Sequence, residues 1–189
     1  MSDTNAYFNV DHTFNAYLEP WPTDHPLATE SELMAMLPVG LQLISQVKAL
    51  EASCLVQLRH LDDEAKSVVD YLKLQSKKID LVLQHVIEQQ QQQGECYKGV
   101  SFGGSGLRLV SPTVIDKQHY KVTLHIREEL VSILCIAHVD TITEQDDGLY
   151  RIDLSFSQII EADVEQLVKA SLSVQQKQLR QRKQRNHQS

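Results

Sequence analysis

Alternating apolar and polar positions predict a β-rich domain built from two separated parts of the chain. One parity of residues 7–18 is mostly apolar, which is the period of a half-buried strand. After residue 94 the alternation returns, and it predicts strands at residues 97–102, 107–110, 120–126, 130–139 and 149–156. Asp147-Gly148, between the last two of these strands, is a strong hairpin signal. Six strands are enough for a small β-barrel.

A stiff connector follows the first strand. Pro20, Pro22 and Pro26 exclude a helix there, because each proline fixes φ and removes a backbone donor. Trp21 lies within this connector, and we expect it to anchor the segment against an apolar surface. A stacking platform for a ligand is the alternative for this side chain.

The apolar positions of residues 28–93 follow a helical period instead. Thr29-x-x-Glu32 has the spacing of a capping box, and it predicts the start of a short helix. Pro38 and Gly40 interrupt that helix, and a second one is predicted at residues 41–58. A third and longer helix is predicted at residues 63–93, with acidic residues at its N-terminus.

The third predicted helix carries a heptad pattern. Its repeating apolar positions, which are our candidate oligomerisation residues, are Ala65, Val68, Leu72, Ile79, Val82 and Val86. Three heptads of this spacing are typical of a coiled coil or of the core of a helix bundle. The apolar stripe is wider than one seam, so a strict two-stranded zipper is disfavoured. We therefore expect this helix to mediate homo-oligomerisation.

The chain ends in another predicted helix, which begins at Ser157 or Glu161. Its last part, residues 175–189, is polar and basic and is expected to fray. No acidic residue follows Glu165, so residues 1–168 carry a formal charge of −13 and the remainder carries +6. Because no aromatic side chain is interleaved with the cations of the tail, nucleic-acid binding is not expected.

Composition narrows the class of protein. The chain has 189 residues and a formal net charge of −7, and no apolar run approaches the length of a membrane span. There is no signal-peptide pattern at the N-terminus. The three cysteines lie far apart without a CxxC pair, which favours a reducing cytoplasm and argues against a disulfide framework or a zinc site. His119, His125 and His138 could approach one another in a sheet, but no metal or other cofactor is expected.

A glycine-rich joint, residues 95–111, connects the helical segment to the later strands. It contains Gly99, Gly103, Gly104 and Gly106. A tight or bulged hairpin turn is one interpretation of this stretch. It is not a phosphate loop, because no Lys-Ser/Thr pair follows it and the next element is a strand rather than a helix.

This joint resembles the central motif of PilZ domains, small β-barrels that in many bacterial proteins bind cyclic di-GMP. The family pattern is Asp-x-Ser-x-x-Gly, and its three positions fall on Ser101, Gly103 and Gly106. The family's Arg-x-x-x-Arg motif is best placed on Asn5 and Asn9, before the first strand. Only the glycine of these motifs is kept, which leaves the fold signal stronger than the ligand signal.

Two further stretches are similar to the same family. Residues 147–182 resemble the closing hairpin and C-terminal helix of bacterial PilZ proteins. Residues 71–86 resemble a long helix inserted after the first strand in an atypical subfamily whose members self-associate, some of them as tetramers. The resemblance implies an α+β fold: a six-stranded antiparallel barrel of residues 5–19 and 95–156, a helical insert of residues 27–93, and a C-terminal helix and basic tail of residues 157–189.

Three classes of function are compatible with these observations. The resemblance implies a non-enzymatic, cytoplasmic regulatory or adaptor protein with a degenerate ligand site. Such a protein would act as a dimer to tetramer on unidentified partners in motility, pili or virulence. The alternative is a genuine cyclic di-GMP receptor that uses other cations, namely Arg108, Arg180 and Arg182. An enzyme is the third class, and the sequence offers it only the carboxylate pair Asp146 and Asp147, in a turn without apolar surroundings.

Overall fold

The computed structural model describes residues 9–42, 54, 63–89 and 93–186 of the chain. The chain divides into two compact units. The first comprises residues 1–35 and 93–189, and the second comprises residues 36–92. The first unit contains every described strand and the C-terminal helix, and the second contains the long helix predicted from the heptad pattern.

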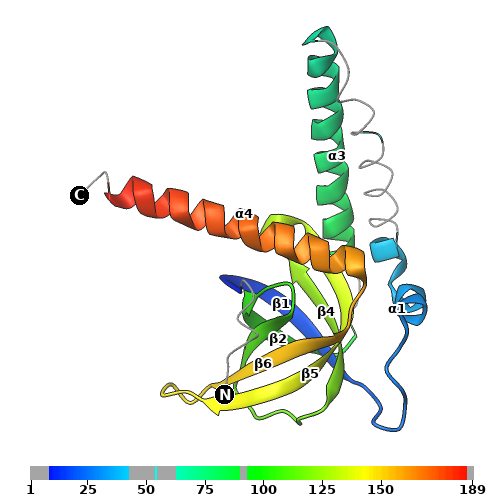
Figure 1. The fold of residues 1–189 in the computed structure, drawn as a ribbon, viewed down its shortest axis with the longest axis vertical. Helices are drawn as coiled ribbons and strands as arrows, with labels where there is room; N and C mark the ends of the chain where they lie inside the picture. The colour runs from blue at the N-terminus through cyan, green and yellow to red at the C-terminus, as the bar shows by residue number, and fades with distance from the viewer. Residues whose placement is uncertain (1–8, 43–53, 55–62, 90–92, 187–189) are drawn as a thin grey trace. The chain divides into compact units, whose positions relative to one another are not determined.

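The first unit is built on a closed barrel of six antiparallel strands (Figure 1). In spatial order the strands run β1-β2-β3-β6-β5-β4. Their bounds are β1 Val10–Pro20, β2 Glu95–Phe102, β3 Gly106–Ser111, β4 His119–Ile126, β5 Val131–Glu144 and β6 Tyr150–Gln158. Strand β1 closes the barrel by pairing with β2 on one side and β4 on the other. The predicted α+β fold with a six-stranded antiparallel barrel is confirmed.

The alternation in the sequence decides which side chains fill the barrel. In β1 the buried residues are Val10, Phe14, Ala16 and Leu18, and Asp11, Thr13 and Asn15 between them are exposed. Burying one face of each strand removes apolar area from water, which is the main stabilising term of such a core. The parity predicted for the first strand is therefore confirmed.

Strand β5 is longer than the sequence predicts. Its last residues, Asp140 to Glu144, are mostly exposed and polar, and they pair with β6 beyond the buried part of the barrel. The predicted end at residue 139 was wrong, because backbone pairing with β6 continues after the apolar run has stopped. The strand also begins one residue later than predicted, since Leu130 adopts a left-handed conformation with φ of 54° after the short 3₁₀ helix η1, Arg127–Glu129.

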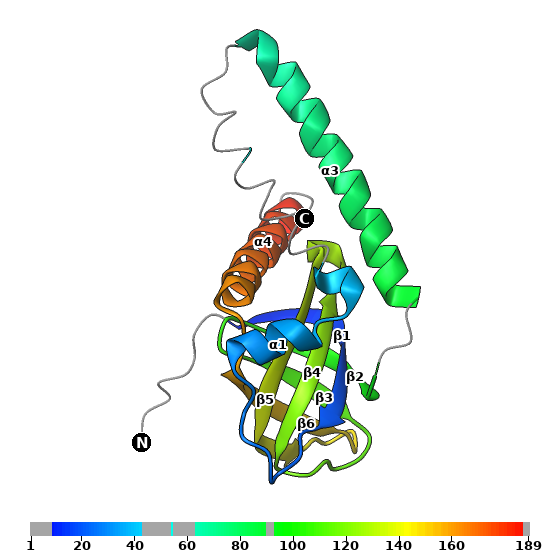
Figure 2. The same ribbon diagram turned by 90° about the vertical axis from the view of Figure 1, so that its right-hand side faces the viewer.

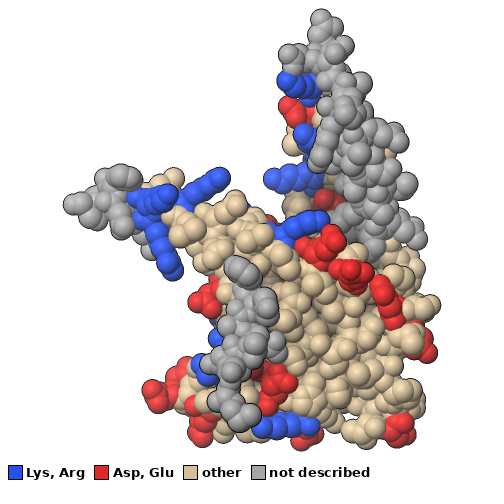
Figure 3. Space-filling model, viewed as in Figure 1, with Lys and Arg blue, Asp and Glu red and all other residues tan. Residues whose placement is uncertain are grey.

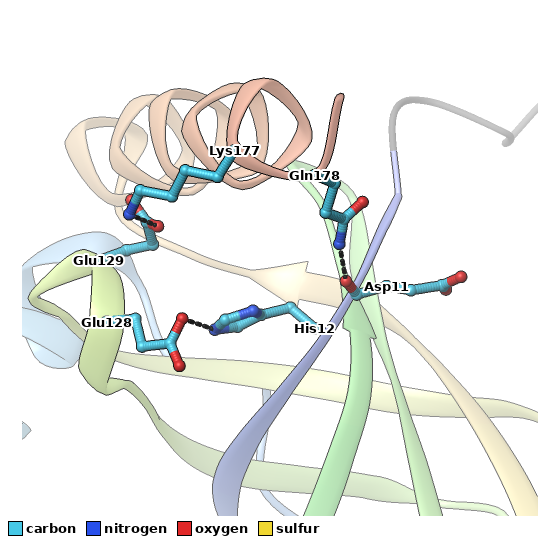
Figure 4. A network of polar contacts seen from close by, with 6 residues as sticks. All are labelled: Asp11, His12, Glu128, Glu129, Lys177 and Gln178. Atoms are coloured by element: carbon cyan, nitrogen blue, oxygen red, sulfur yellow. Dashed lines mark hydrogen bonds and ion pairs between the residues drawn. The ribbon is translucent and has the colours of Figure 1, made fainter. Parts of the chain in front are cut away.

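Helix α4, Glu161–Asn186, lies across one end of the barrel. Leu167, Ala170 and Val174 on its inner face belong to the same buried cluster as the barrel core. The prediction that residues 175–189 fray was wrong as far as Asn186, where the helix ends. Figure 4 shows two reasons: Lys177 Nζ lies 2.7 Å from Glu129 Oε1 of η1, and Gln178 Nε2 donates to the carbonyl oxygen of Asp11 at 2.6 Å.

Helix α1, Glu30–Met36, begins with the predicted capping box. Thr29 N–H donates to Glu32 Oε2 at 2.7 Å, and Glu32 N–H donates to Thr29 Oγ1 at 3.3 Å. These bonds lower the pKa of the Glu32 carboxyl. The helix lies against the outside of β4 and β5 (Figure 2). Its Leu33 is fully buried.

The second unit contains the long helix α3, Asp63–Gln89. The predicted third helix therefore exists. Its predicted end, residue 93, lies beyond the last helical residue that the structure describes, Gln89. The second predicted helix, residues 41–58, falls mostly outside the described residues. The three of its residues that the structure describes, Leu41, Gln42 and Cys54, are helical. None of the described helices is long and apolar enough to cross a membrane.

Candidate functional site

The turn between β2 and β3, residues 103–105, lies where the resemblance predicts the ligand loop. Its backbone is tied down at both ends: Gly103 N–H donates to the carbonyl oxygen of Gly106, and Phe156 N–H donates to that of Ser105, each at 3.0 Å. Gly106 is required by close packing, because a Cβ there would lie 2.2 Å from the carbonyl oxygen of Leu154 on β6. The glycine kept from the family motif thus has a structural role in this chain.

Helix α4 packs on the same turn. A Cβ added to Gly104 would lie 2.8 Å from Val168 Cγ2 and 3.7 Å from Val164 Cγ1. The turn therefore carries glycine at a point where a helix approaches the backbone closely. This is the packing explanation of the glycine-rich joint, and it accounts for Gly104 and Gly106 without a ligand.

The other two positions of the motif offer little to a ligand. Ser101 is 2% exposed, and its neighbours in the sheet are Asp11 on β1 and Arg108 on β3. Gly103 has no side chain, and its N–H is used within the turn. Asn9 is exposed and immediately precedes β1, whereas Asn5 lies outside the described residues.

Arg108 is held by an acidic neighbour. Its Nε lies 2.5 Å from Asp153 Oδ1 across the β3–β6 ladder, and both side chains are only about one-third exposed or less, at 36% and 28%. The second carboxylate oxygen of Asp153 accepts a hydrogen bond from Thr141 Oγ1 at 3.0 Å. Arg180 and Arg182, the other candidate cations, are exposed on the outer half of α4, where Lys and Arg side chains gather in Figure 3.

Carboxylates surround the start of β1, where the family's arginine motif would begin. Figure 4 shows Asp11, Glu128 and Glu129 here, beneath α4. The Glu129 side chain is only 8% exposed and is paired with Lys177, whereas that of Glu128 is 73% exposed and lies 3.9 Å from His12 Nε2. The described charges at this end of the barrel thus include three carboxylates.

The histidines singled out in the sequence separate into a pair and a single residue. His119 on β4 faces His138 on β5, with ring centroids 4.8 Å apart. Burial, and then the neighbouring His138, lowers the pKa of His119. His125 is 7% exposed on β4, and burial lowers its pKa to about 4. Within the described residues no three His, Cys, Asp or Glu side chains form a metal-binding group.

The cysteines are free thiols in this structure. Cys54 and Cys96 are exposed, whereas Cys135 is fully buried in the barrel core. Burial, and then the Asp163 carboxylate, raises the pKa of Cys135 well above its usual value, so this thiol stays protonated.

Helix α3 exposes large apolar side chains on more than one side. Along the heptad row, Val68, Leu72, Ile79, Val82 and Val86 are 45–63% exposed, and the side chain of Ala65 is outside the described set. Three large side chains outside the heptad row are also exposed, namely Tyr71, Leu74 and Leu81. At 100° per residue Leu74 and Leu81 fall on the side of the helix opposite the heptad row. Leu74 and Leu81 are themselves seven residues apart, and this second heptad spacing in the sequence could have revealed the second apolar side of the helix.

Comparison with known proteins places the fold. A scan against models of protein families finds no match, and neither does a search of curated proteins. Among solved structures, the chain is similar to a pathogenic protein from Xanthomonas campestris, a tetrameric PilZ domain self-assembled through a helical bundle. The identity is 14%, the TM-score is 0.54, and the match covers 93% of this chain and 91% of that one.

Two matches are partial. The Bacillus subtilis inhibitor of motility, MotI, is 16% identical with a TM-score of 0.41, over 44% of this chain and 43% of its own. The PilZ domain of Escherichia coli YcgR, solved with cyclic di-GMP, is 9% identical with a TM-score of 0.38, over 47% of this chain and 77% of that one. The likeness to the Xanthomonas protein over nearly the whole chain shows that the fold is PilZ-like.

Proposed function

We propose that this chain with a PilZ-like fold is a non-enzymatic regulatory or adaptor protein of the cyclic di-GMP signalling family. It acts in the cytoplasm through self-association and protein–protein contacts in the control of motility, pili or virulence. One observation carries the proposal. The residues at the family's ligand positions make packing contacts and ion pairs within the barrel unit, while helix α3 exposes an apolar face.

The ligand site is degenerate because it has lost its positive charge. Cyclic di-GMP carries two phosphates, and arginine binds phosphate through paired, charge-assisted hydrogen bonds. Asparagine at residues 5 and 9 cannot supply that charge. Each lost contact of this kind is worth roughly 1.5–3 kcal/mol, so two of them reduce affinity by several orders of magnitude.

The surroundings do not replace the missing arginines. Arg108 would have to leave Asp153, to which it is bound at 2.5 Å, before it could bind a phosphate. The carboxylates of Asp11 and Glu128 at the start of β1 would repel an approaching dianion. Helix α4 packs on Gly104 and so covers part of the turn. A receptor that uses these cations is therefore the less supported alternative.

Self-association is assigned to α3. Burying the exposed half of one Val, Leu or Ile side chain stabilises an assembly by roughly 1 kcal/mol. Five such side chains lie along the heptad row, and Leu74 and Leu81 lie on the other side. Apolar residues on two sides suit a bundle of more than two helices better than a simple zipper. The Xanthomonas protein of similar fold assembles as a tetramer through a helical bundle, which supports a dimer to tetramer here.

Isothermal titration calorimetry with cyclic di-GMP, at low and at moderate salt, tests the ligand half of the proposal. We expect no saturable heat at micromolar concentrations, with the circular dichroism spectrum confirming that the protein is folded. Micromolar binding that weakens with salt would instead establish the receptor alternative. The variants Arg108→Gln and Arg180→Gln/Arg182→Gln would then identify which cations bind the phosphates.

Analytical ultracentrifugation tests the assembly half. The double variant Leu72→Glu/Ile79→Glu places two charges in the heptad row, and we expect it to sediment as a monomer while the unaltered chain forms a dimer to tetramer. The matched control is Lys73→Glu, an exposed position on α3 that lies away from both the heptad row and Leu74 and Leu81. A monomeric wild type, or a double variant of unchanged mass, would refute the assignment of α3.

A further inference from the structure

A hollow of about 330 Å³ opens on the barrel unit beside the proline-rich connector. The connector supplies Trp21, Pro22, Thr23, His25 and Leu27, and the strands with the loop before β4 supply Lys117, Gln118, His119 and His138. Its volume is at the lower end of the range for small-molecule sites. All nine lining residues belong to the barrel unit, so the hollow does not depend on the helical unit.

The hollow is separate from the β2–β3 turn, since none of residues 103–105 lines it. Across the sheet, His138 pairs with Ser155 on β6, and Ser155 pairs with Gly106 directly after the turn. His138 therefore lies two strands from the motif glycine, and the hollow lies near the family's ligand positions but includes none of them.

The residues that line the hollow carry aromatic and basic side chains but no acidic one. They include an indole, three imidazoles and an ammonium group, in a chain with 25 acidic and 18 basic residues. Lys117 is exposed, and within the described residues it forms no ion pair. Three carboxylates lie close by without lining the hollow: Asp140 Oδ1 is 3.4 Å from His138 Nδ1 on the β5 wall, and the exposed Asp24 and Asp116 directly precede His25 and Lys117 in the chain. A hollow with these groups favours an anion over a cation.

The aromatic groups are held in place before any ligand arrives. Trp21 N–H donates to the carbonyl oxygen of His119 at 2.9 Å, and its indole Nε1–H donates to that of Pro26 at 3.3 Å. The indole N–H is thus already used, and the ring is available for stacking rather than for hydrogen bonding. The paired strands β4 and β5 hold the imidazoles of His119 and His138 in an edge-to-face arrangement.

We propose that this hollow binds a nucleoside monophosphate. The base stacks on Trp21, and the phosphate accepts hydrogen bonds from Lys117 and from imidazole N–H groups of the lining histidines. A phosphate suits several convergent donors because it offers three acceptor oxygens, and a planar base suits an indole whose polar edge is already satisfied. No residue of the β2–β3 turn takes part in this binding.

Trp21 is the single tryptophan of the chain, so its fluorescence reports on the hollow directly. The full-length protein is titrated with AMP and with GMP, with excitation at the red edge of tryptophan absorption, where nucleotides do not absorb. We expect a saturable change in emission with at least one of the two. Adenosine or guanosine, which lack the phosphate, and ribose 5-phosphate, which lacks the base, should each bind at least about tenfold more weakly.

The variant Lys117→Gln should weaken binding of the nucleotide about tenfold, the loss of one charge-assisted hydrogen bond. Lys117 is exposed, so this variant should keep the wild-type fold, and Lys98→Gln on β2 is the matched control that should leave affinity unchanged. The absence of a saturable signal with both AMP and GMP at millimolar concentration would overturn the proposal. Equal affinities of wild type and Lys117→Gln would overturn it as well.

Discussion

The barrel should lose stability below pH 6.5 because β4 carries a buried, neutral histidine. His125 is 7% exposed, and burial lowers its pKa to about 4. Its Nδ1 lies 2.9 Å from Ser132 Oγ, and its Nε2 is buried without a hydrogen-bond partner in the described part of the chain. A proton added to this ring would place a charge on a buried imidazole whose Nε2 has no acceptor in the described part of the chain.

The size of the effect follows from linkage. In the unfolded chain the same imidazole has a pKa of about 6.5, so between pH 6.5 and about 4 the unfolded state binds more protons than the folded state. The stability that comes from the neutral ring is complete above pH 6.5 and is lost as the pH falls toward 4. At pH 5 the loss amounts to about 2 kcal/mol relative to pH 8.

Urea unfolding at pH 8 and pH 5, at a fixed protein concentration, measures this loss. The variant His125→Gln keeps a polar group near Ser132 but does not titrate, so its free energy of unfolding should fall by about 2 kcal/mol less than that of the wild type. The exposed His25→Gln is the control and should follow the wild type. Equal pH dependence in wild type and His125→Gln, within about 0.5 kcal/mol, would refute the reasoning.

Three further predictions concern packing and charge, and each is read from the urea midpoint at pH 8. Lys177→Met leaves the nearly buried Glu129 carboxylate without its partner and should cost about 1–3 kcal/mol. Gly106→Ala places a Cβ 2.2 Å from the Leu154 carbonyl oxygen and should destabilise by about 3 kcal/mol or more, whereas a loss below about 1 kcal/mol would contradict the close approach. Thr29→Ala removes one half of the capping box and should cost about 1 kcal/mol, with no change in the barrel's near-ultraviolet spectrum.

The sequence predicted the elements of the barrel well because period-two alternation is a local property. Each predicted strand corresponds to an observed one, with ends that differ by a few residues. The largest error was at the end of β5, where polar residues continue to pair with β6. Alternation reveals where a strand is buried, but backbone pairing continues wherever a partner strand is present.

The basic tail also shows that a local sequence pattern cannot reveal tertiary contacts. Its polar, basic composition predicted that residues 175–189 fray, yet α4 is helical to Asn186. The contacts that support it join residues distant in sequence: Lys177 to Glu129, and Gln178 to Asp11. No pattern within the tail could have shown that carboxylate and carbonyl groups from η1 and β1 lie beneath it.

The candidate site was predictable only as a set of positions. The motif spacing placed Ser101, Gly103 and Gly106 in and on either side of the turn between two strands, and Arg108 on the second of them. It did not show that Asp153, 45 residues further on, holds Arg108, or that α4 covers Gly104. The predicted strands allowed His119, His125 and His138 to approach one another, and the barrel brings together only His119 and His138, with His125 buried apart from them.

The sequence by itself determined which segments become strands or helices, where α1 is capped, and which face of each strand is buried. Those properties depend on neighbours within a few residues, and periodicity and capping chemistry record them directly. Only the tertiary structure decided which charges are paired, which histidine stays neutral, and that Trp21, Lys117 and His138 line one hollow. Those properties depend on burial and on distances between residues far apart in the chain, which the closure of the barrel sets.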